Sequence, residues 1–386
     1  MSDTWWIGEE QLDDEQKDVI GLPLNSSFLV TGPPGCGKTN LLLLRANYMV
    51  FAGYPNIAIV VFTRSLQEFI ASGGQQYAFP SSKIMTSRRF AQNVLLDAGR
   101  PFNPPDGFEP QRTYCSAELQ KLIEEEHPEP LYDAVLIDEA QDYLPGEIEA
   151  FSKFGRVIFA VADPKQKVYK GADPLETIRK VVGQERQLHH HYRCGINICR
   201  LADALGKRWK NYEELTPTSH YDEKKRPSSV EAIRCANLDD MAEKMINKLR
   251  VQLQAYPDEW LGVVTPRHEE AEALWARISQ SDIGGKAVFY TDRTGLLFKP
   301  AMNIFVGTTH SGKGLEFRAL HIGGGDYLSR FFDRQRFLAF TAVTRAKTSL
   351  SIYFEDALPG FFEKAIQTLK PLPDLPKLKD VFGNKS

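Results

Sequence analysis

The fold is decided by one stretch of the sequence, Gly32-Pro33-Pro34-Gly35-Cys36-Gly37-Lys38-Thr39, which matches the pattern GxxxxGK followed by Ser or Thr at every fixed position. The apolar run Ser27–Val30 precedes it and predicts a strand, and Asn40–Met49 after it has a helical pattern. Between a strand and a helix, such a loop lets backbone N–H groups surround phosphates, and the helix N-terminus adds a partial positive charge. The stretch therefore predicts a nucleoside-triphosphate site, for ATP above all, that comprises the loop and Asn40.

Two pairs of side chains are predicted to carry the phosphate chemistry. In the loop, Lys38 is expected to reach the β- and γ-phosphates, and the Thr39 hydroxyl is expected to bind Mg²⁺. Farther along, four apolar residues lead directly into Asp138-Glu139. Asp138 is predicted to hold Mg²⁺ through its water shell, and Glu139 is predicted to orient and deprotonate the attacking water.

Apolar runs bounded by polar or turn residues recur along the chain in two series, which is typical of parallel strands covered on both faces. The first series is Ser27–Val30, Ile57–Phe62, Ala134–Ile137 and Val157–Val161. The second is Val230–Arg234, Trp260–Val264, Ala287–Tyr290, Asn303–Val306, Ala319–Ile322 and Leu350–Tyr353, with helices expected at Leu238–Ala255 and His268–Ser279. We predict an α/β protein with two open, mainly parallel sheets, in domains of residues 1–185 and 186–369, and a loose tail over 370–386.

Composition limits the class of protein. The net charge of −3 is too low for a protein that coats DNA, so any nucleic-acid contact must come from a local groove. The chain has no apolar run long enough for a membrane span and begins without a signal-peptide pattern, so we expect a cytoplasmic protein without membrane contact. Three consecutive histidines, residues 189–191, point in different directions along an extended chain, which favours a polar surface over a metal site.

From Leu12 to Ile352, the motifs resemble superfamily 1A helicases of the UvrD/Rep type. The segment Asp138–Asp142 is similar to motif II, Gly307–Phe317 to motif V, and Ala342–Ala346 to motif VI. The resemblance implies two RecA-like P-loop NTPase domains in tandem, with ATP in the cleft between them. It also implies roles at the nucleotide: Gln16 and Tyr192 at adenine, Glu316 near the ribose, and Gln166, Arg193 and the arginine finger Arg345 at the γ-phosphate.

The same resemblance implies contacts with single-stranded DNA. Residues of the segments similar to motifs Ia, Ic and V would make them, namely Phe62, Thr63, Arg64, Thr86, Phe90, Thr308 and His310. For Phe62 and Phe90, packing in the core remains an equally good interpretation.

The chain departs from the family in three places. The intervals between Phe90 and Ala134 and between Ser279 and Gly307 are too short for the inserted domains that relatives carry, called 1B and 2B. The segment Tyr169–Asp173 is also shorter than in relatives, and no tryptophan or phenylalanine stands at the place of the aromatic residue that stacks between bases there. Base stacking contributes about 1–3 kcal/mol per base, so its loss would weaken the coupling of ATP turnover to stepping.

Two functions therefore remain open at this point. The first is an ATP-dependent translocase or helicase that moves 3′ to 5′ on single-stranded DNA. The second is a nucleotide-gated switch or sensor that regulates a protein partner, such as a nuclease in a repair or defence complex. A small-molecule kinase would leave the segments similar to motifs V and VI unexplained.

Overall fold

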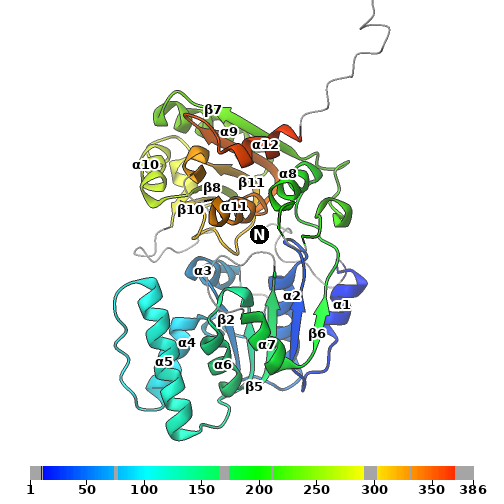
Figure 1. Cartoon of the computed structure of the whole chain (residues 1–386), viewed down its shortest axis with the longest axis vertical. Helices are drawn as coiled ribbons and strands as arrows, with labels where there is room; N and C mark the ends of the chain where they lie inside the picture. The colour runs from blue at the N-terminus through cyan, green and yellow to red at the C-terminus, as the bar shows by residue number, and fades with distance from the viewer. Residues whose placement is uncertain are drawn as a thin grey trace, which may run out of the picture.

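The computed structural model describes residues 10, 12–73, 77–164, 174–209, 212–290, 302–329 and 332–369. They form two α/β domains, one above the other in Figure 1, and we call the half with the first sheet domain 1 and the half with the second sheet domain 2. This confirms the predicted fold class of two parallel sheets in tandem. The expected tail, residues 370–386, lies outside the described residues.

The sheet of domain 1 has six parallel strands in the order β3-β2-β4-β5-β1-β6. They are β1 (Phe28–Thr31), β2 (Ile57–Val61), β3 (Ile84–Thr86), β4 (Tyr132–Ile137), β5 (Gly155–Ala162) and β6 (Glu185–Gln187). Every residue of β1 and β2 is buried, which explains their uninterrupted apolar runs. The four predicted strands are present. The short strands β3 and β6 were not predicted, and the expected domain boundary after residue 185 falls inside β6.

Seven helices of domain 1 lie on the two faces of this sheet. They are α1 (Asp14–Ile20), α2 (Lys38–Phe51), α3 (Arg64–Gly73), α4 (Ser87–Asp97), α5 (Phe108–Glu126), α6 (Pro145–Phe154) and α7 (Pro174–Val182). Apolar side chains of α4 to α7 pack together on one face of the sheet. Helices α2 and α3 cover the other face, and α1 packs on α2. Helix α5 thus lies in the short chain interval between Phe90 and Ala134.

The sheet of domain 2 also has six parallel strands, in the order β7-β12-β11-β8-β10-β9. They are β7 (Ser229–Arg234), β8 (Leu261–Thr265), β9 (Ala287–Phe289), β10 (Ile304–Thr308), β11 (Phe317–Ile322) and β12 (Ala346–Phe354). All six were predicted. Strands β8 and β10 are almost completely buried and apolar, whereas β7 is partly exposed and alternates apolar with polar residues. Its helices are α8 (Ile196–Gly206), α9 (Leu238–Ala255), α10 (His268–Ile278), α11 (Phe332–Val343) and α12 (Gly360–Gln367). Helices α9 and α10 cover one face, and α8, α11 and α12 the other.

Single turns of 3₁₀ helix complete the described elements. They are η3 (Ser81–Lys83), η4 (Ala140–Asp142), η5 (Thr216–Thr218), η6 (Gly284–Lys286) and η7 (Gly325–Ser329). None of the helices within the described ranges combines the length and the apolar character needed to cross a bilayer.

The two domains share one buried apolar cluster. It joins Leu66 and Phe69 of α3 to Phe305 of β10 and to Leu315 of domain 2. The ring of Phe69 also meets the ring of Trp260 edge-on, with 6.2 Å between the centroids. Helix α3 therefore docks domain 1 onto domain 2, beside the cleft between the two sheets.

Candidate functional site

The predicted phosphate-binding loop lies where β1 ends and α2 begins. Gly35 and Gly37 have φ values of +84° and +86°, a left-handed conformation that favours glycine. A Cβ atom added at Gly35 would lie 2.5 Å from the Cβ atom of Arg193, too close for any side chain. The glycines therefore shape the loop and also let the segment that connects the two sheets approach it.

Lys38 and Thr39 follow this loop at the start of α2. In this structure, Lys38 Nζ donates hydrogen bonds to the carbonyl oxygens of Gly32 at 2.8 Å and Pro33 at 2.9 Å. The Thr39 hydroxyl donates to the Asp138 carboxylate, 3.0 Å from Oδ2. Hydroxyl and carboxylate oxygens are the donors that Mg²⁺ takes in proteins, so these two side chains fit the predicted metal role.

Glu139 follows β4 with a strained backbone. Its φ of 49° and ψ of 44° lie in the left-handed region, which residues other than glycine adopt rarely. Gln141 fixes its side chain, because the Gln141 amide donates to Glu139 Oε2 at 2.5 Å and accepts from the Asp163 N–H at 3.0 Å. Such strain is concentrated at functional sites, where the surroundings hold it in place.

The two neighbouring carboxylates have opposite pKa shifts. Burial, and then the adjacent Glu139, raise the pKa of Asp138 to about 7. Burial also raises the pKa of Glu139, but the charges of Lys313 and Arg345 outweigh it, so that the pKa is lowered. Glu139 therefore keeps its negative charge near neutral pH, as a group that accepts a proton from water must.

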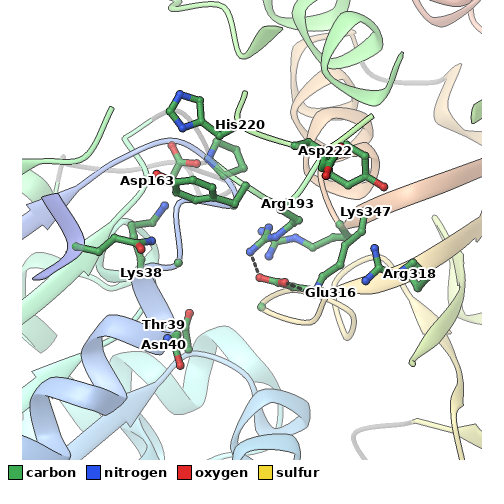
Figure 2. A pocket seen from close by; sticks show the side chains of 18 of the residues that line it. Lys38, Thr39, Asn40, Asp163, Arg193, His220, Asp222, Glu316, Arg318 and Lys347 are labelled. Atoms are coloured by element: carbon green, nitrogen blue, oxygen red, sulfur yellow. Dashed lines mark hydrogen bonds and ion pairs between the residues drawn. The ribbon is translucent and has the colours of Figure 1, made fainter. Parts of the chain in front are cut away.

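Domain 2 and the connecting segment, residues 188–195, present three cations to the site, and two of them pair with the half-buried carboxylate of Glu316. Glu316 pairs with Arg193, and Lys347 Nζ lies 3.0 Å from Glu316 Oε2 (Figure 2). Burial raises the pKa of Glu316, but Arg193 and Lys347 outweigh it and lower the pKa to about 2. The third cation, Arg345, faces domain 1, and its Nη2 atom lies 3.8 Å from Glu139 Oε1.

The two residues predicted to contact the base, Gln16 and Tyr192, are bonded to the backbone of the phosphate-binding loop. Gln16 forms a capping box with Asp13 at the start of α1, and its Nε2 atom donates to the Cys36 carbonyl at 3.0 Å. The Tyr192 N–H donates to the Gly35 carbonyl at 3.1 Å, and its hydroxyl donates to Asp13. Both residues are thus attached to the phosphate-binding loop, although α1 and Tyr192 are far apart in the sequence.

Asn40 is a polar side chain inside this site without a partner in the described part of the chain. It is 5% exposed, and neither its amide nitrogen nor its amide oxygen has a hydrogen-bond partner there. An unsatisfied buried amide costs about 1–3 kcal/mol. Asn40 also lines the cavity described next, so a ligand in that cavity can satisfy it.

One cavity of about 610 Å³ unites these groups between the two domains (Figure 2). It is lined from domain 1 by Gln16, Pro34, Gly35, Gly37, Lys38, Thr39, Asn40, Asp138, Glu139 and Asp163. From the connecting segment and domain 2 it is lined by Tyr192, Arg193, His220, Tyr221, Asp222, Lys225, Arg226, Gly314, Glu316, Arg318, Arg345 and Lys347. Gly32, Pro33 and the buried Cys36 belong to the loop but do not line the cavity.

Phe90 was a candidate for a DNA contact or for the core, and the structure places it in the core. Its side chain is fully buried and packs against Tyr132, Phe151 and Phe154 in the core of domain 1. Phe62 is half-buried, and its ring meets the rings of Phe108 and Tyr143 edge-on. Phe90 is therefore a core residue, and Phe62 is largely one.

The other predicted DNA contacts are divided between interdomain bonds, local bonds and the surface. Thr63 donates to the Lys313 carbonyl in domain 2 at 3.2 Å, and Thr308 donates to Ser311 at 3.1 Å. Thr86 caps α4, because its hydroxyl accepts from the Arg89 N–H at 3.4 Å. Two side chains lie at the surface: Arg64, which pairs with Glu68, and His310.

Some residues of the cavity were not singled out from the sequence. Lys347 follows Arg345 by two positions and lines the same cavity. Side chains two positions apart at the start of a strand point to the same side, so this spacing could have indicated Lys347. Arg318 and His220 have no such signal in their surroundings. The predicted γ-phosphate sensor Gln166 and the segment Tyr169–Asp173 lie outside the described residues.

The three consecutive histidines form no common site. His189 pairs with Glu15 at 3.0 Å, and the ring of His190 stacks on His220. His191 is buried, and its Nε2 atom lies 2.7 Å from the Leu215 carbonyl. Within the described ranges, no group of three or more His, Cys, Asp or Glu side chains is arranged to hold a metal ion.

Solved structures similar to this chain include two helicases. The C-terminal domain of a possible DNA helicase from Lactobacillus plantarum WCFS1 aligns with 17% identity and a TM-score of 0.35, over 46% of this chain and 96% of that chain. The PRRSV helicase aligns with 16% identity and a TM-score of 0.39, over 94% of this chain and 58% of that chain. No model of a protein family and no curated protein sequence matches the chain. The assignment of function and site residues therefore depends on the geometry of this chain.

Proposed function

We propose that the chain hydrolyses Mg²⁺·ATP in the cavity between its domains and uses the cycle to move along single-stranded DNA, from 3′ to 5′, as a translocase or helicase of the UvrD-like type. One observation carries the proposal. A single cavity brings the phosphate-binding loop and Asp138-Glu139 of domain 1 together with Arg193 and Arg345. Nucleoside triphosphatases that work by domain closure need this combination.

Each side chain has a role in this proposal. Thr39 and Asp138 would hold Mg²⁺, which neutralises phosphate charge when bound. Lys38 leaves the carbonyl oxygens of Gly32 and Pro33 and turns to the phosphates. Glu139, held by Gln141, accepts the proton of the attacking water, and Asn40 contacts the nucleotide or its hydrated metal.

The two arginines make hydrolysis sensitive to the distance between the domains. Arg345 faces Glu139 across the cleft at 3.8 Å, and Arg193 lies against the loop at Gly35. Guanidinium groups placed at the γ-phosphate stabilise the charge of the transition state. Release of phosphate removes the anion that attracts them, so domain 2 can move relative to domain 1. Repetition of this movement on a bound strand would produce translocation.

The steady-state ATPase rate with and without single-stranded DNA tests the proposal. We expect Mg²⁺-dependent turnover that DNA stimulates, and no turnover with Lys38→Ala. A 3′-tailed and a 5′-tailed duplex then test direction, because a 3′ to 5′ motor displaces a strand only from the first. Turnover that neither DNA nor RNA changes, in protein that binds ATP, contradicts the translocase.

A second candidate function has specific support. Thr63, on the segment similar to motif Ia, and Ser65, just after that segment, both donate to carbonyl oxygens of domain 2, at Lys313 and Ser311. Their hydroxyl groups thus form hydrogen bonds between the domains. Phe90, another candidate DNA contact, is buried. These features favour a nucleotide-gated switch that regulates a protein partner, such as a nuclease, with little unwinding of its own. A partner captured from cell extract by Glu139→Gln protein with ATP, and released without ATP, would support the switch.

A further inference from the structure

The segment Ser219–Arg226 belongs to the nucleotide cavity, although its polar sequence is typical of a surface loop. His220, Tyr221 and Asp222 line the cavity together with the phosphate-binding loop. A bridge between His191 and Ser219 holds the segment in place, and the His220 N–H donates to the His191 carbonyl at 2.8 Å. The segment is therefore attached to the connecting chain immediately beside Tyr192.

Three aromatic side chains form a corner at this point. The rings of His190 and His220 are stacked, with 4.3 Å between the centroids and 21° between the planes. The ring of Tyr192 meets His220 at 79°, with 5.5 Å between the centroids. Because Tyr192 and His220 touch and are nearly perpendicular, a flat ligand cannot enter between them. A ligand that lies flat on Tyr192 must present its edge to His220.

The position of Tyr192 identifies that ligand. Its N–H is bonded to Gly35 and its hydroxyl to Asp13, so the ring stands beside the phosphate-binding loop. A nucleotide with its phosphates on this loop brings its base to the same ring. Gln16, the predicted reader of the base, already uses its amide nitrogen on Cys36 and its amide oxygen on Asp13. Each of these two atoms keeps one further hydrogen-bonding position for the base, and His220, a residue of the cavity wall that touches Tyr192, adds a second polar group beside the base edge.

We propose that His220 reads the edge of the purine and sets the preference of the site for adenine over guanine; the inference rests on the proposed nucleotide function. A neutral imidazole has one acceptor nitrogen. Adenine presents a 6-amino group that can donate to it, whereas guanine presents a carbonyl oxygen at the same place. Because His220 is exposed, this bond gives the modest preference of one hydrogen bond for the base that carries the donor. The stack on His190 fixes the plane of the His220 ring, and the bond requires the tautomer whose acceptor nitrogen, and not its N–H, faces the base.

The test measures equilibrium binding of the Mg²⁺ complexes of AMP-PNP and GMP-PNP to the full chain. His220→Phe keeps an aromatic ring on His190 and removes the nitrogen atoms. We expect this variant to bind AMP-PNP about 10-fold more weakly, the effect of one lost hydrogen bond, and to bind GMP-PNP within about twofold of the wild type. His268→Ala, which removes an exposed histidine of α10, serves as the control and should leave both affinities unchanged.

The outcomes separate this inference from the proposed function. Equal weakening of both analogues by His220→Phe would mean that His220 only supports Tyr192, and an unchanged preference would mean that it does not meet the base; either result overturns the inference. If the wild type hydrolyses ATP while His220→Phe keeps the wild-type preference, the inference alone fails. If the wild type binds neither analogue, both fail.

Discussion

Lys313 of domain 2 and Asp142 of domain 1 form an ion pair across the cleft, and both side chains are buried. Asp142 ends the turn that carries Glu139, and Lys313 belongs to the loop after β10. Lys313 is also the largest of the charges that lower the pKa of Glu139. One interdomain contact therefore connects the relative position of the domains to the charge of the predicted general base.

Removal of one partner of this pair should destabilise the protein strongly. Lys313→Met leaves the Asp142 charge buried without its cation, which typically costs about 3–5 kcal/mol. The double variant Lys313→Met/Asp142→Leu should recover most of the loss, because it removes both charges. Urea unfolding of the four proteins completes a double-mutant cycle. A coupling below about 0.5 kcal/mol would show that the two residues act independently.

Glu139→Gln should bind Mg²⁺·ATP and fail to hydrolyse it. The amide cannot accept the proton of the attacking water, and loss of a general base lowers turnover by about 10²–10⁴-fold. Single-turnover hydrolysis and equilibrium binding, measured side by side, separate the two effects. Glu363→Gln, an exposed change on α12, is the matched control. Full turnover in Glu139→Gln would assign the base to another residue.

Arg345→Lys should lower turnover with little effect on the affinity for ATP. Lysine keeps the positive charge but lacks the planar guanidinium that spans γ-phosphate oxygens, and loss of an arginine finger lowers turnover by about 10³–10⁵-fold. The ATPase rate at saturating ATP measures the effect, and Arg200→Lys at the surface of α8 controls for the substitution. A change confined to the KM would indicate that Arg345 only binds substrate.

Asn40→Ala should change stability in opposite ways with and without nucleotide. Without ligand, the variant loses an unsatisfied buried amide, so its melting temperature should equal or exceed that of the wild type. With Mg²⁺·AMP-PNP, the increase in melting temperature should be smaller than in the wild type, because a ligand contact is missing. Thermal denaturation with and without the analogue gives both values. An unchanged ligand-induced increase would place Asn40 outside the nucleotide contacts.

Glu316→Gln should reduce stability at neutral pH and lose that effect in acid. The pKa of Glu316 is lowered from 4.5 to about 2, so its carboxylate stabilises the folded protein fully above about pH 4.5, and the contribution disappears as the pH falls toward 2. A shift of this size corresponds to about 3 kcal/mol. Urea midpoints of wild type and variant should therefore differ equally at pH 7 and 5 and converge at pH 3 and 2. A constant difference across this range would contradict the ionic role.

The sequence predicted the sheets well because their strands are buried. All strands with an apolar run, such as β2 and β8, were located to within a few residues, since a strand covered on both faces has to be apolar throughout. Strand β6 is exposed at each of its three residues, so no pattern marks it. It is held by backbone hydrogen bonds to β1, which side chains do not encode.

The phosphate side of the site was predicted more completely than its other walls. Lys38, Thr39, Asp138 and Glu139 lie within short motifs whose spacing is dictated by the strand ends that carry them. His220 lies in a polar stretch, and only the bridge to His191 brings it to the cavity. For Phe90, the sequence pattern was present but could not decide between two positions in the fold. An aromatic residue in a helix gives the same pattern in the core and at a nucleic-acid surface, and only burial separates the two.

The chain that joins the domains is short and fixed along its length. Its Leu188 N–H is bonded to Thr31, its Tyr192 N–H to Gly35, and its Gly195 N–H to Lys347. Insertions should therefore have different effects in this segment and in surface loops. A reporter domain or a circular permutation break should be accepted in the surface stretch 100–107, whereas even one added glycine between residues 188 and 195 would loosen the connection between the two domains. In the proposed cycle, such a variant would still hydrolyse ATP, but hydrolysis would no longer move domain 2 relative to domain 1.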